Sequence, residues 1–326
     1  MMTDSVLDAS VRSLFEDIEF TSEPAGLYDP LRYMIAIGGK RIRPRLCMTT
    51  YSLFKDSLTD DVLEAAAALE VFHTFTLIHD DIMDKSPMRR GEPTVWAKWN
   101  EDTAILSGDV MLIDAYSRIS RTTPSMHAKL VPLFSKTAAE VCEGQQYDME
   151  FESRDDVSTM EYDKMIGLKT AVLLACSSKM GAIIAGASDE QCDALYRYGY
   201  ELGMAFQVAD DYLDAYGDAK VFGKPIGGDI LNEKKSWLTI RALEKTSDKA
   251  GFLSSFKAAA VTDEEKASKI ASVKSIYDSL GVADDARAQI REFSSQAMNA
   301  VKGIGLGEEE YETLRIFCDR LIGRAR

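Results

Sequence analysis

Helical patterning runs through almost the whole chain and limits what it can fold into. Only 8 of its 326 residues are proline, and there are no extended alternating runs of Val, Ile and Thr of the kind that form strands. We therefore predict an all-α fold. The predicted helices cover residues 5–19, 42–55, 60–86, 101–121, 125–150, 159–187, 189–217, 231–246, 263–280, 282–302 and 307–323.

Nothing in the sequence divides this pattern into separate domains. No low-complexity linker or shift in composition interrupts it, and 46% of the residues are hydrophobic, which is ample for a sizeable core. We expect one large helical domain over residues 1–326. Glycine- and proline-bearing loops are predicted at Gly38-Gly39, between Ser86 and Pro93, and between Gly223 and Gly228.

Charge and cysteine content limit which kinds of partner the protein can bind and in which cellular compartment it is expected. A formal net charge of −15 argues against a general nucleic-acid surface. The acidic segment from Met1 to Phe20 has no apolar run, so we expect no signal peptide. We also expect no stretch to reach the ~20 apolar residues of a membrane span, and therefore no stable membrane insertion. Five scattered cysteines without CxxC spacing indicate reduced core thiols in a cytoplasmic protein: Cys47, Cys142, Cys176, Cys192 and Cys318.

A first acidic cluster ends the apolar helix predicted over residues 60–86. Asp80 and Asp84 are four residues apart, so their carboxylates share one helix face, and Asp81 lies beside them. Like charges at this spacing destabilise a helix unless a cation lies between them. Hard oxygen ligands suit Mg²⁺, which also takes phosphate oxygens of a substrate. The alternative is a solvated acidic helix end.

A second acidic cluster repeats this arrangement roughly 130 residues later. Gln207, Asp210, Asp211 and Asp214 form one polar stripe on a helix whose other faces are apolar. Two such motifs on two apolar helices are far more specific than one. If the helices face each other, their carboxylates can bracket two or three Mg²⁺ ions around one diphosphate.

Cations cluster near the first acidic motif. The segment from Gly38 to Pro44 joins two glycines to three cations, and Arg43 can grip phosphate oxygens as a fork. It lacks the spacing of a Walker P-loop. A second basic pair, Arg89 and Arg90, follows the acidic cluster. In so acidic a chain these groups suggest two anion sites, one bridged by metal and one bound by cations alone; the alternative is ordinary surface charge.

Taken together, these motifs resemble those of the trans-prenyl diphosphate synthase (polyprenyl synthetase) family. The resemblance extends from about residue 30 to about residue 240. It implies an isoprenoid (terpenoid) synthase bundle around a central cavity, and a homodimer. The matching pieces are Gly38 to Pro44, His79 to Asp84, Arg89 to Gly91, Gly108-Asp109, Lys169-Thr170, Gln207, Asp210 to Asp214, Gly223-Lys224, Gly227 to Ile230, and Lys234.

The resemblance also implies a role for each matching residue. Isopentenyl diphosphate would be held by Gly39, Lys40, Arg43, His73 and Arg90. Mg²⁺ would be bound by Asp80, Asp84 and Asp210, supported directly or through water by Asp81, Asp211 and Asp214. The allylic diphosphate would contact Arg89, Lys169, Lys224 and Lys234, and Thr170 and Gln207 would flank the developing cation. The groups closest to the chemistry would be Arg89, Lys169, Thr170 and Gln207.

The implied reaction is ionisation, condensation and elimination. Diphosphate leaves the allylic carbon, the double bond of isopentenyl diphosphate attacks the cation, and a proton is lost. We find no convincing Ser-His-Asp or Cys-His arrangement, and none is required, because the released diphosphate can take the proton. Such catalysis rests on electrostatic preorganisation and on exclusion of water.

Product length is expected to depend on bulk just before the first acidic motif. Phe75 lies five residues before Asp80, roughly 7–8 Å along the helix, and the small Thr76 lies nearer the face of Asp80. One aromatic residue without an insertion resembles members that make a C20 product, with C15 next; the alternative is that Phe75 is plain core. Trp96 departs from a position that is often polar in the family.

Three other functions compete with chain elongation. A class I terpene cyclase shares the fold but usually lacks the segment from Gly38 to Pro44 and the second Asp-rich motif. A non-catalytic partner subunit tends to lose metal ligands, whereas all six Asp are present here. A metal-dependent phosphohydrolase, suggested by His79-Asp80, would need more His ligands than the three in the chain.

Overall fold

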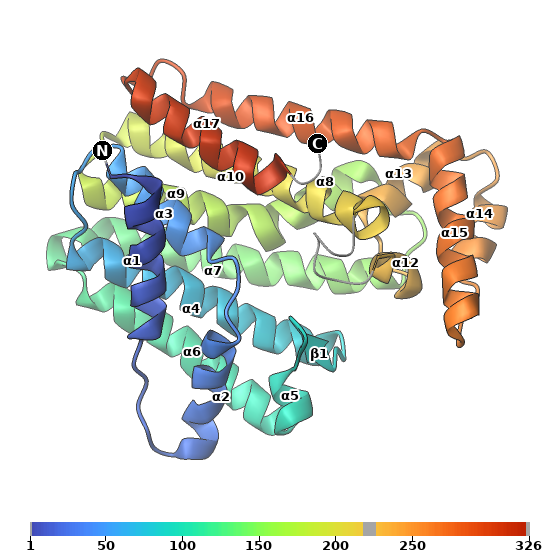
Figure 1. The fold of residues 1–326 in the computed structure, drawn as a ribbon, viewed down its shortest axis with the longest axis horizontal. Helices are drawn as coiled ribbons and strands as arrows, with labels where there is room; N and C mark the ends of the chain where they lie inside the picture. The colour runs from blue at the N-terminus through green and yellow to red at the C-terminus, as the bar shows by residue number, and fades with distance from the viewer. Residues whose placement is uncertain (1, 218–225, 324–326) are drawn as a thin grey trace. The chain divides into compact units, whose positions relative to one another are not determined.

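Helices make up almost all of the regular structure, as predicted (Figure 1). The computed structural model describes residues 2–217 and 226–323. Within these ranges the strands are β1 (Met88–Arg89) and β2 (Glu92–Pro93), which pair as one antiparallel hairpin. The all-α prediction is confirmed.

The chain divides into two compact units that are interleaved in sequence. The N-terminal unit comprises Met1–Lys136 and Cys176–Tyr196, and the C-terminal unit comprises Thr137–Ala175 and Arg197–Arg326. A single functional domain over residues 1–326 stays a prediction.

The N-terminal unit is built around α4 (Asp60–Met83). Residues Ala65 to Leu69 of α4 are fully buried, and small side chains let neighbouring helices approach closely. In α6 (Glu101–Arg121) a Cβ on Gly108 would lie 2.2 Å from His79 Nε2, so a larger residue there would displace the His79 ring. The other helical segments of this unit are α1 (Asp4–Glu16), α2 (Ala25–Ala36), α3 (Ile42–Ser52), α5 (Val95–Lys98), α6 (Glu101–Arg121) and the parts of α7 (Pro124–Glu152), α9 (Val172–Ala185) and α10 (Asp189–Tyr216) that fall in it.

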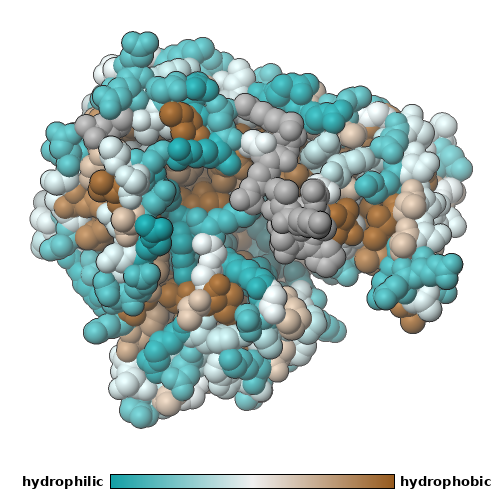
Figure 2. All heavy atoms as spheres, in the orientation of Figure 1, coloured by the Kyte–Doolittle hydropathy of each residue, from teal (hydrophilic) through white to brown (hydrophobic). Residues whose placement is uncertain are grey.

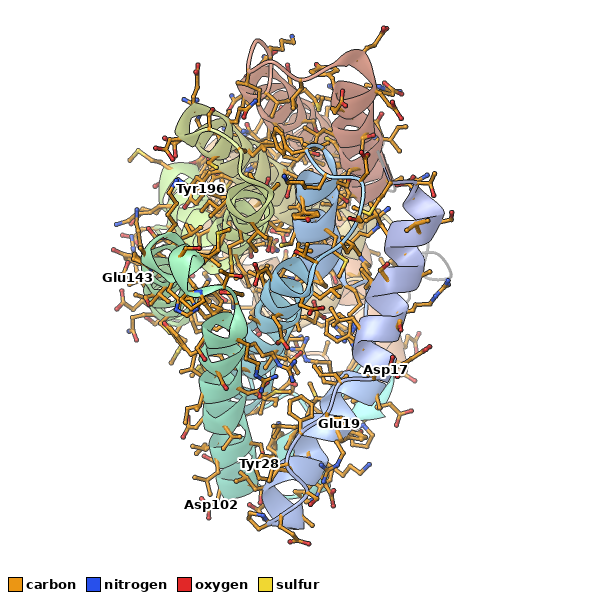
Figure 3. The ribbon with its side chains drawn as sticks, turned by 90° about the vertical axis from the view of Figure 1, so that its left-hand side faces the viewer. Asp17, Glu19, Tyr28, Asp102, Glu143 and Tyr196 are labelled. Atoms are coloured by element: carbon orange, nitrogen blue, oxygen red, sulfur yellow. The ribbon has the colours of Figure 1, made fainter. Side chains whose placement is uncertain are left out.

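Apart from two four-residue helices, Val95–Lys98 and Gly228–Leu231, two helices were not predicted from the sequence. The first is α2, where Pro24, Gly26 and Pro30 mask the helical pattern, although Pro30 lies inside the helix. Figure 3 shows Tyr28 of α2 and Asp102 of α6 at the same end of these two helices, and Ser107 Oγ donates to the Leu27 carbonyl at 3.2 Å. Contact with α6 thus stabilises a helix whose local propensity is poor.

The second unpredicted helix, α14 (Lys249–Phe256), belongs to the C-terminal unit. Asp248 begins it by accepting the Gly251 N–H at 2.9 Å, and the rings of Phe252 and Phe256 stack at 5.7 Å. The other elements of this unit are the remainders of α7, α9 and α10, together with α8 (Thr159–Ile166), the π-helical η1 (Gly167–Ala171), α12 (Gly228–Leu231), α13 (Trp237–Lys245), α15 (Asp263–Ser279), α16 (Val282–Ala300) and α17 (Glu308–Ile322).

Two expectations about apolar residues need correction. All five cysteines are free, but Cys142 is exposed and is not a core thiol.

Two helical stretches, Asp60–Met83 and Thr159–Ala185, do have the length and hydropathy of a membrane span. Their most apolar windows are 67% and 83% buried inside the structure, as in core helices. Figure 2 shows hydrophilic residues over most of the visible surface, in keeping with the net charge of −15.

Asp163 of α8 makes stability depend on pH. Burial, reinforced by Glu244, raises the pKa of Asp163 to about 6. Its Oδ1 is buried and has no hydrogen-bond partner among the described residues. Because the folded-state pKa exceeds the unfolded one, the ionised carboxylate opposes folding above pH 6, and this cost is relieved as the pH falls towards 4.

Asp163→Asn is therefore expected to stabilise the protein at pH 7.5 by about 1 kcal/mol after allowance for solvent screening, and to bring no gain near pH 4. Urea unfolding at the two pH values measures the difference. An equal gain at both pH values would show that the ionisation of Asp163 is not responsible.

Candidate active site

One face of α4 carries the predicted polar residues of the N-terminal unit. His73, Thr76, Asp80 and Asp84 follow one another at helical spacing, and each is at least partly exposed. The Asp80 side chain is 20% exposed, and Asp84 is exposed at the helix end. Two carboxylates thus face solvent on the stripe that also carries His73.

Asp81 lies on a different face and has a different environment. It is almost fully buried, and both its oxygens accept from Arg89 Nε, at 2.9 and 2.8 Å. Burial raises the pKa of Asp81, although Arg89 opposes the shift. Arg89 Nη2 also lies 3.9 Å from Asp80 Oδ2. Asp81 therefore anchors Arg89 beside Asp80.

The hairpin that follows α4 brings two distant basic segments together. Arg90 and Gly91 form its turn with φ of 55° and 82°, the pattern of a type I′ turn. Gly39 has φ of 148°, and a Cβ there would lie 2.5 Å from Arg90 Nη1. Glycine is needed at position 39 because the Arg90 guanidinium lies directly against its backbone.

Arg43, His73 and Arg90 form what we call the cation cluster. Burial, together with Arg90, lowers the pKa of Arg43 to about 10, which leaves it charged at neutral pH; its Nε is buried without a hydrogen-bond partner among the described residues. Burial and the nearby arginines hold the pKa of His73 well below its usual range, so its ring is neutral. Lys40, which follows Gly39 in the loop before α3, is exposed. Such a cluster suits a polyphosphate anion.

His79 and Trp96 have structural partners. His79 Nε2 lies 3.1 Å from the Ile105 carbonyl of α6, away from the polar stripe of α4. The Trp96 indole N–H donates to the Ser86 carbonyl at 2.9 Å and so closes the base of the hairpin. Over residues 2–217 and 226–323, no three His, Cys, Asp or Glu side chains converge as a metal site by themselves.

In the C-terminal unit, glycines bring Thr170 and Gln207 together. Gly199 and Gly203 are four residues apart on α10, and a Cβ on Gly203 would lie 2.5 Å from the Ala171 Cα. One turn further on, the Thr170 hydroxyl donates to Gln207 Oε1 at 3.1 Å. The spacing of residues 199, 203 and 207 therefore puts the close helix contact and the polar pair on one face.

Lys169 lies in the π-helical segment η1, and such bulges often occur at functional sites. A Cβ on Gly144 of α7 would lie 2.2 Å from the Lys169 backbone nitrogen. One turn later on α7, Asp148 accepts from Lys169 Nζ at 2.6 Å. Although burial opposes it, Lys169 and Lys234 lower the pKa of Asp148. Asp148 was missed from the sequence, where its four-residue spacing from Gly144 is too common a pattern to distinguish it.

Asp211 connects three helices. It is almost fully buried and accepts from Gln207 Nε2 at 2.9 Å, from the Trp237 backbone N–H at 2.8 Å and from the Tyr162 hydroxyl. Burial, reinforced by Asp229, raises the pKa of Asp211 to about 7, opposed by its donors and Lys234. Asp211 thus joins α8, α10 and the start of α13. The sequence predicted instead that Asp211 supports Mg²⁺, directly or through water, and that role stays a prediction.

Asp214 connects α10 to α12. Its Oδ2 accepts the Asp229 N–H at 3.0 Å, and its carbonyl accepts the Gly227 N–H at 2.6 Å. Asp210 lies on the same partly buried stripe as Gln207 and Asp214. Lys224 lies outside the described residues.

Comparison with known proteins identifies the family. The model of the family described as Polyprenyl synthetase matches residues 24–279. The chain belongs to this family. It is 42% identical over 243 residues to the geranylgeranyl diphosphate synthase of Methanosarcina mazei, a match that covers 74% of each chain.

Similarity to solved structures supports the same family assignment. A crystal structure of a geranylgeranyl pyrophosphate synthase has a TM-score of 0.93 and 41% identity and covers 99% of both chains. A second neighbour is the geranylgeranyl pyrophosphate synthase of Corynebacterium glutamicum, complexed with isoprenyl diphosphate and magnesium. It has a TM-score of 0.85 and 26% identity over 98% of each chain. The protein therefore has the isoprenoid synthase fold and is a short-chain prenyltransferase. These matches do not favour the alternatives of a terpene cyclase or a non-catalytic partner subunit.

Proposed function

We propose that this polyprenyl synthetase condenses isopentenyl diphosphate with allylic diphosphates to a C20 all-trans product. The observation that supports this most strongly is the arrangement beside α4. Asp80 and Asp84 offer carboxylates to a metal, while the Arg90 guanidinium lies against Gly39, in the loop that leads to the buried Arg43. One diphosphate can thus bind through metal and the other through cations alone.

The acidic residues fit Mg²⁺ by their chemistry. Asp80 and Asp84 supply hard oxygen ligands one turn apart, and Asp210 lies at the corresponding place on the stripe of α10. Among residues 2–217 and 226–323, too few side chains converge in either place to fill a coordination shell, which suits an ion that keeps waters and takes phosphate oxygens. We propose two or three Mg²⁺ ions, held by Asp80, Asp84 and Asp210. When bound, they would neutralise the departing diphosphate.

The remaining residues would bind and orient the reactants. Arg89, fixed by Asp81, and Lys169, fixed by Asp148, would contact the allylic diphosphate, together with Lys224 and Lys234. The Thr170 hydroxyl and the side-chain amide oxygen of Gln207, Oε1, would present partial negative charge to the developing cation. The cation cluster would hold isopentenyl diphosphate so that its double bond attacks. The released diphosphate would take the proton.

The elongation assay tests this proposal. Purified protein is incubated with isopentenyl diphosphate, Mg²⁺ and, separately, C5, C10 and C15 allylic diphosphates, and products are sized by mass spectrometry. We expect C20 from each starter and no product with EDTA. A folded, magnesium-bound protein that elongates none of the starters would contradict the proposal.

Phe75 is expected to limit product length. It is largely buried, and its ring contacts those of Phe72 and His79 at 5.4 and 4.9 Å. Removing the ring in Phe75→Ala opens space one turn below Asp80, so we expect products of C25 and longer to replace C20 as the main species. Phe252→Ala, which removes a ring from α14 instead, is the control. An unchanged C20 product in Phe75→Ala would show that other helices set the length.

We further propose that the protein is a cytoplasmic homodimer formed through α6. Leu106 and Ile113 are 57% and 66% exposed and lie seven residues apart on one helix face. Exposed apolar side chains on one helix face are typical of an interface between subunits.

Replacing both with Glu in Leu106→Glu/Ile113→Glu is expected to give a particle of about the 36.1 kDa chain mass, against twice that mass for the wild type. Light scattering during gel filtration measures it. Val261→Glu, which changes a still more exposed apolar residue of the C-terminal unit, should stay dimeric. A dimer that survives the double change would place the interface elsewhere.

A further inference from the structure

Glu70 is a buried carboxylate in the middle of α4. Its side chain is 2% exposed in an otherwise apolar stretch of α4. Oε1 accepts from Arg41 Nη1 at 2.7 Å, whereas Oε2 is buried and accepts no hydrogen bond from the described residues. A buried charge in such a place is costly unless it is compensated. Its partner Arg41 therefore indicates what Glu70 does.

Arg41 joins four elements of the N-terminal unit. While Nη1 donates to Glu70 of α4, Nη2 donates to the Ile35 carbonyl of α2 at 2.6 Å. The guanidinium also lies 4.4 Å from the centre of the Phe15 ring of α1. Arg41 itself begins α3. Its fork thus fixes the start of α3 against α1, α2 and α4.

The loop held in this way has an unfavourable backbone. Gly38, Gly39 and Arg41 all have positive φ, at 81°, 148° and 47°. Such conformations persist only where surrounding contacts fix them, above all for a residue with a side chain. The same loop carries Lys40 and leads to Arg43, so its conformation decides where these cations point.

Glu70 also acts on the cation cluster directly. Its charge raises the pKa of Arg43 and of Arg90, opposing the burial that lowers both. Two complementary atoms, Glu70 Oε2 and Arg43 Nε, are buried without hydrogen-bond partners among the described residues. The negative charge of Glu70 thus offsets the repulsion between the guanidiniums that lie near the neutral His73 ring.

We propose that Glu70 is a positioning residue for the diphosphate of isopentenyl diphosphate, which it serves by fixing the loop from Gly38 to Arg43 through Arg41. The identity of the ligand rests on the proposed function. Two effects of opposite sign compete, because the charge of Glu70 also repels the anion. Arg41 compensates that charge at 2.7 Å. Removing Glu70 would leave Arg41 as an unpaired buried cation beside other guanidiniums, so positioning outweighs repulsion.

Glu70→Gln tests this proposal, and Glu64→Gln on the same helix is its matched control. Glu64 also has a buried Oε2 without a hydrogen-bond partner among the described residues, and it pairs with Arg118 at 3.6 Å instead. Calorimetry with inorganic diphosphate in EDTA measures metal-independent binding, and steady-state kinetics give KM for each substrate. We expect Glu70→Gln to weaken diphosphate binding and to raise KM for isopentenyl diphosphate by about tenfold or more. KM for the allylic substrate should change less than about twofold.

Glu64→Gln should leave all these values unchanged. Arg41→Lys keeps the charge but loses the fork, and combined with Glu70→Gln it should add little to the single changes, because both act through one contact. If Glu70→Gln does not fold, Glu70→Asp, which keeps the charge but shortens its reach, is expected to shift binding in the same direction.

Three results would separate the two proposals. Unchanged or tighter diphosphate binding in folded Glu70→Gln would overturn the role of Glu70, because repulsion would then match or exceed positioning. A wild-type protein that binds no diphosphate in EDTA would overturn it as well. A wild type that binds diphosphate but elongates no substrate would overturn the proposed function, and calorimetry would still decide the role of Glu70.

Discussion

Asp80→Ala is expected to lower kcat by about a thousandfold or more while the protein stays folded. Asp80 lies on the solvent-facing stripe of α4, where we propose that it binds Mg²⁺. Loss of metal-assisted neutralisation of the leaving group costs several kcal/mol of transition-state stabilisation, and each ~1.4 kcal/mol is a factor of ten in rate. Initial rates with a C15 allylic diphosphate measure the effect.

Two variants on the same helix sharpen this prediction. Asp60→Ala removes an acidic residue from the first turn of α4 and should keep wild-type activity. Asp81→Asn should act mainly through Arg89, because the amide accepts only at one oxygen. Activity of Asp80→Ala within tenfold of the wild type would show that Asp80 is not a metal ligand.

Asp211→Ala is expected to destabilise the C-terminal unit by about 3–5 kcal/mol, because it leaves several buried donors without an acceptor. The donors are Gln207 Nε2, the Trp237 N–H and the Tyr162 hydroxyl. Calorimetry should show a fall in Tm of roughly 10 °C for a unit of this size.

The control for this change is Asp193→Ala, which removes an exposed carboxylate from α10. Asp193 pairs with Lys179 on the surface, so its loss should cost less than about 0.5 kcal/mol. Asp211→Asn keeps the shape and one acceptor oxygen and should fall between the two. A Tm for Asp211→Ala within 2–3 °C of the wild type would contradict the role of Asp211 as a buried support, given about 2–4 °C per kcal/mol.

The sequence predicts the fold class and the identities of the motif residues because both are local. Periodicity places α4 and α10, and spacing places Asp80 with His73 and Gln207 with Asp214 on single helix faces. The missed helix α2 shows the limit of this reasoning, since contacts with α6 outweigh its two prolines and its glycine.

Partners could not be predicted, because they depend on which distant segments meet. Asp81 and Asp80 are neighbours in one motif, yet one is buried against Arg89 and the other is partly exposed. Asp148 and Glu70 had no motif to distinguish them from other acidic residues. Their roles follow from close approaches, such as that of Gly144 to Lys169, that only the three-dimensional arrangement reveals.

The most direct test of the account compares diphosphate release with elongation in a single reaction. Protein, Mg²⁺, isopentenyl diphosphate and a C15 allylic diphosphate are mixed, and inorganic diphosphate and prenyl products are quantified together. We predict one diphosphate released for each isopentenyl diphosphate consumed, with a product five carbons longer than the starter, and neither without metal. Diphosphate released from the allylic substrate while isopentenyl diphosphate is left unused would contradict the account, because it would show ionisation without chain elongation.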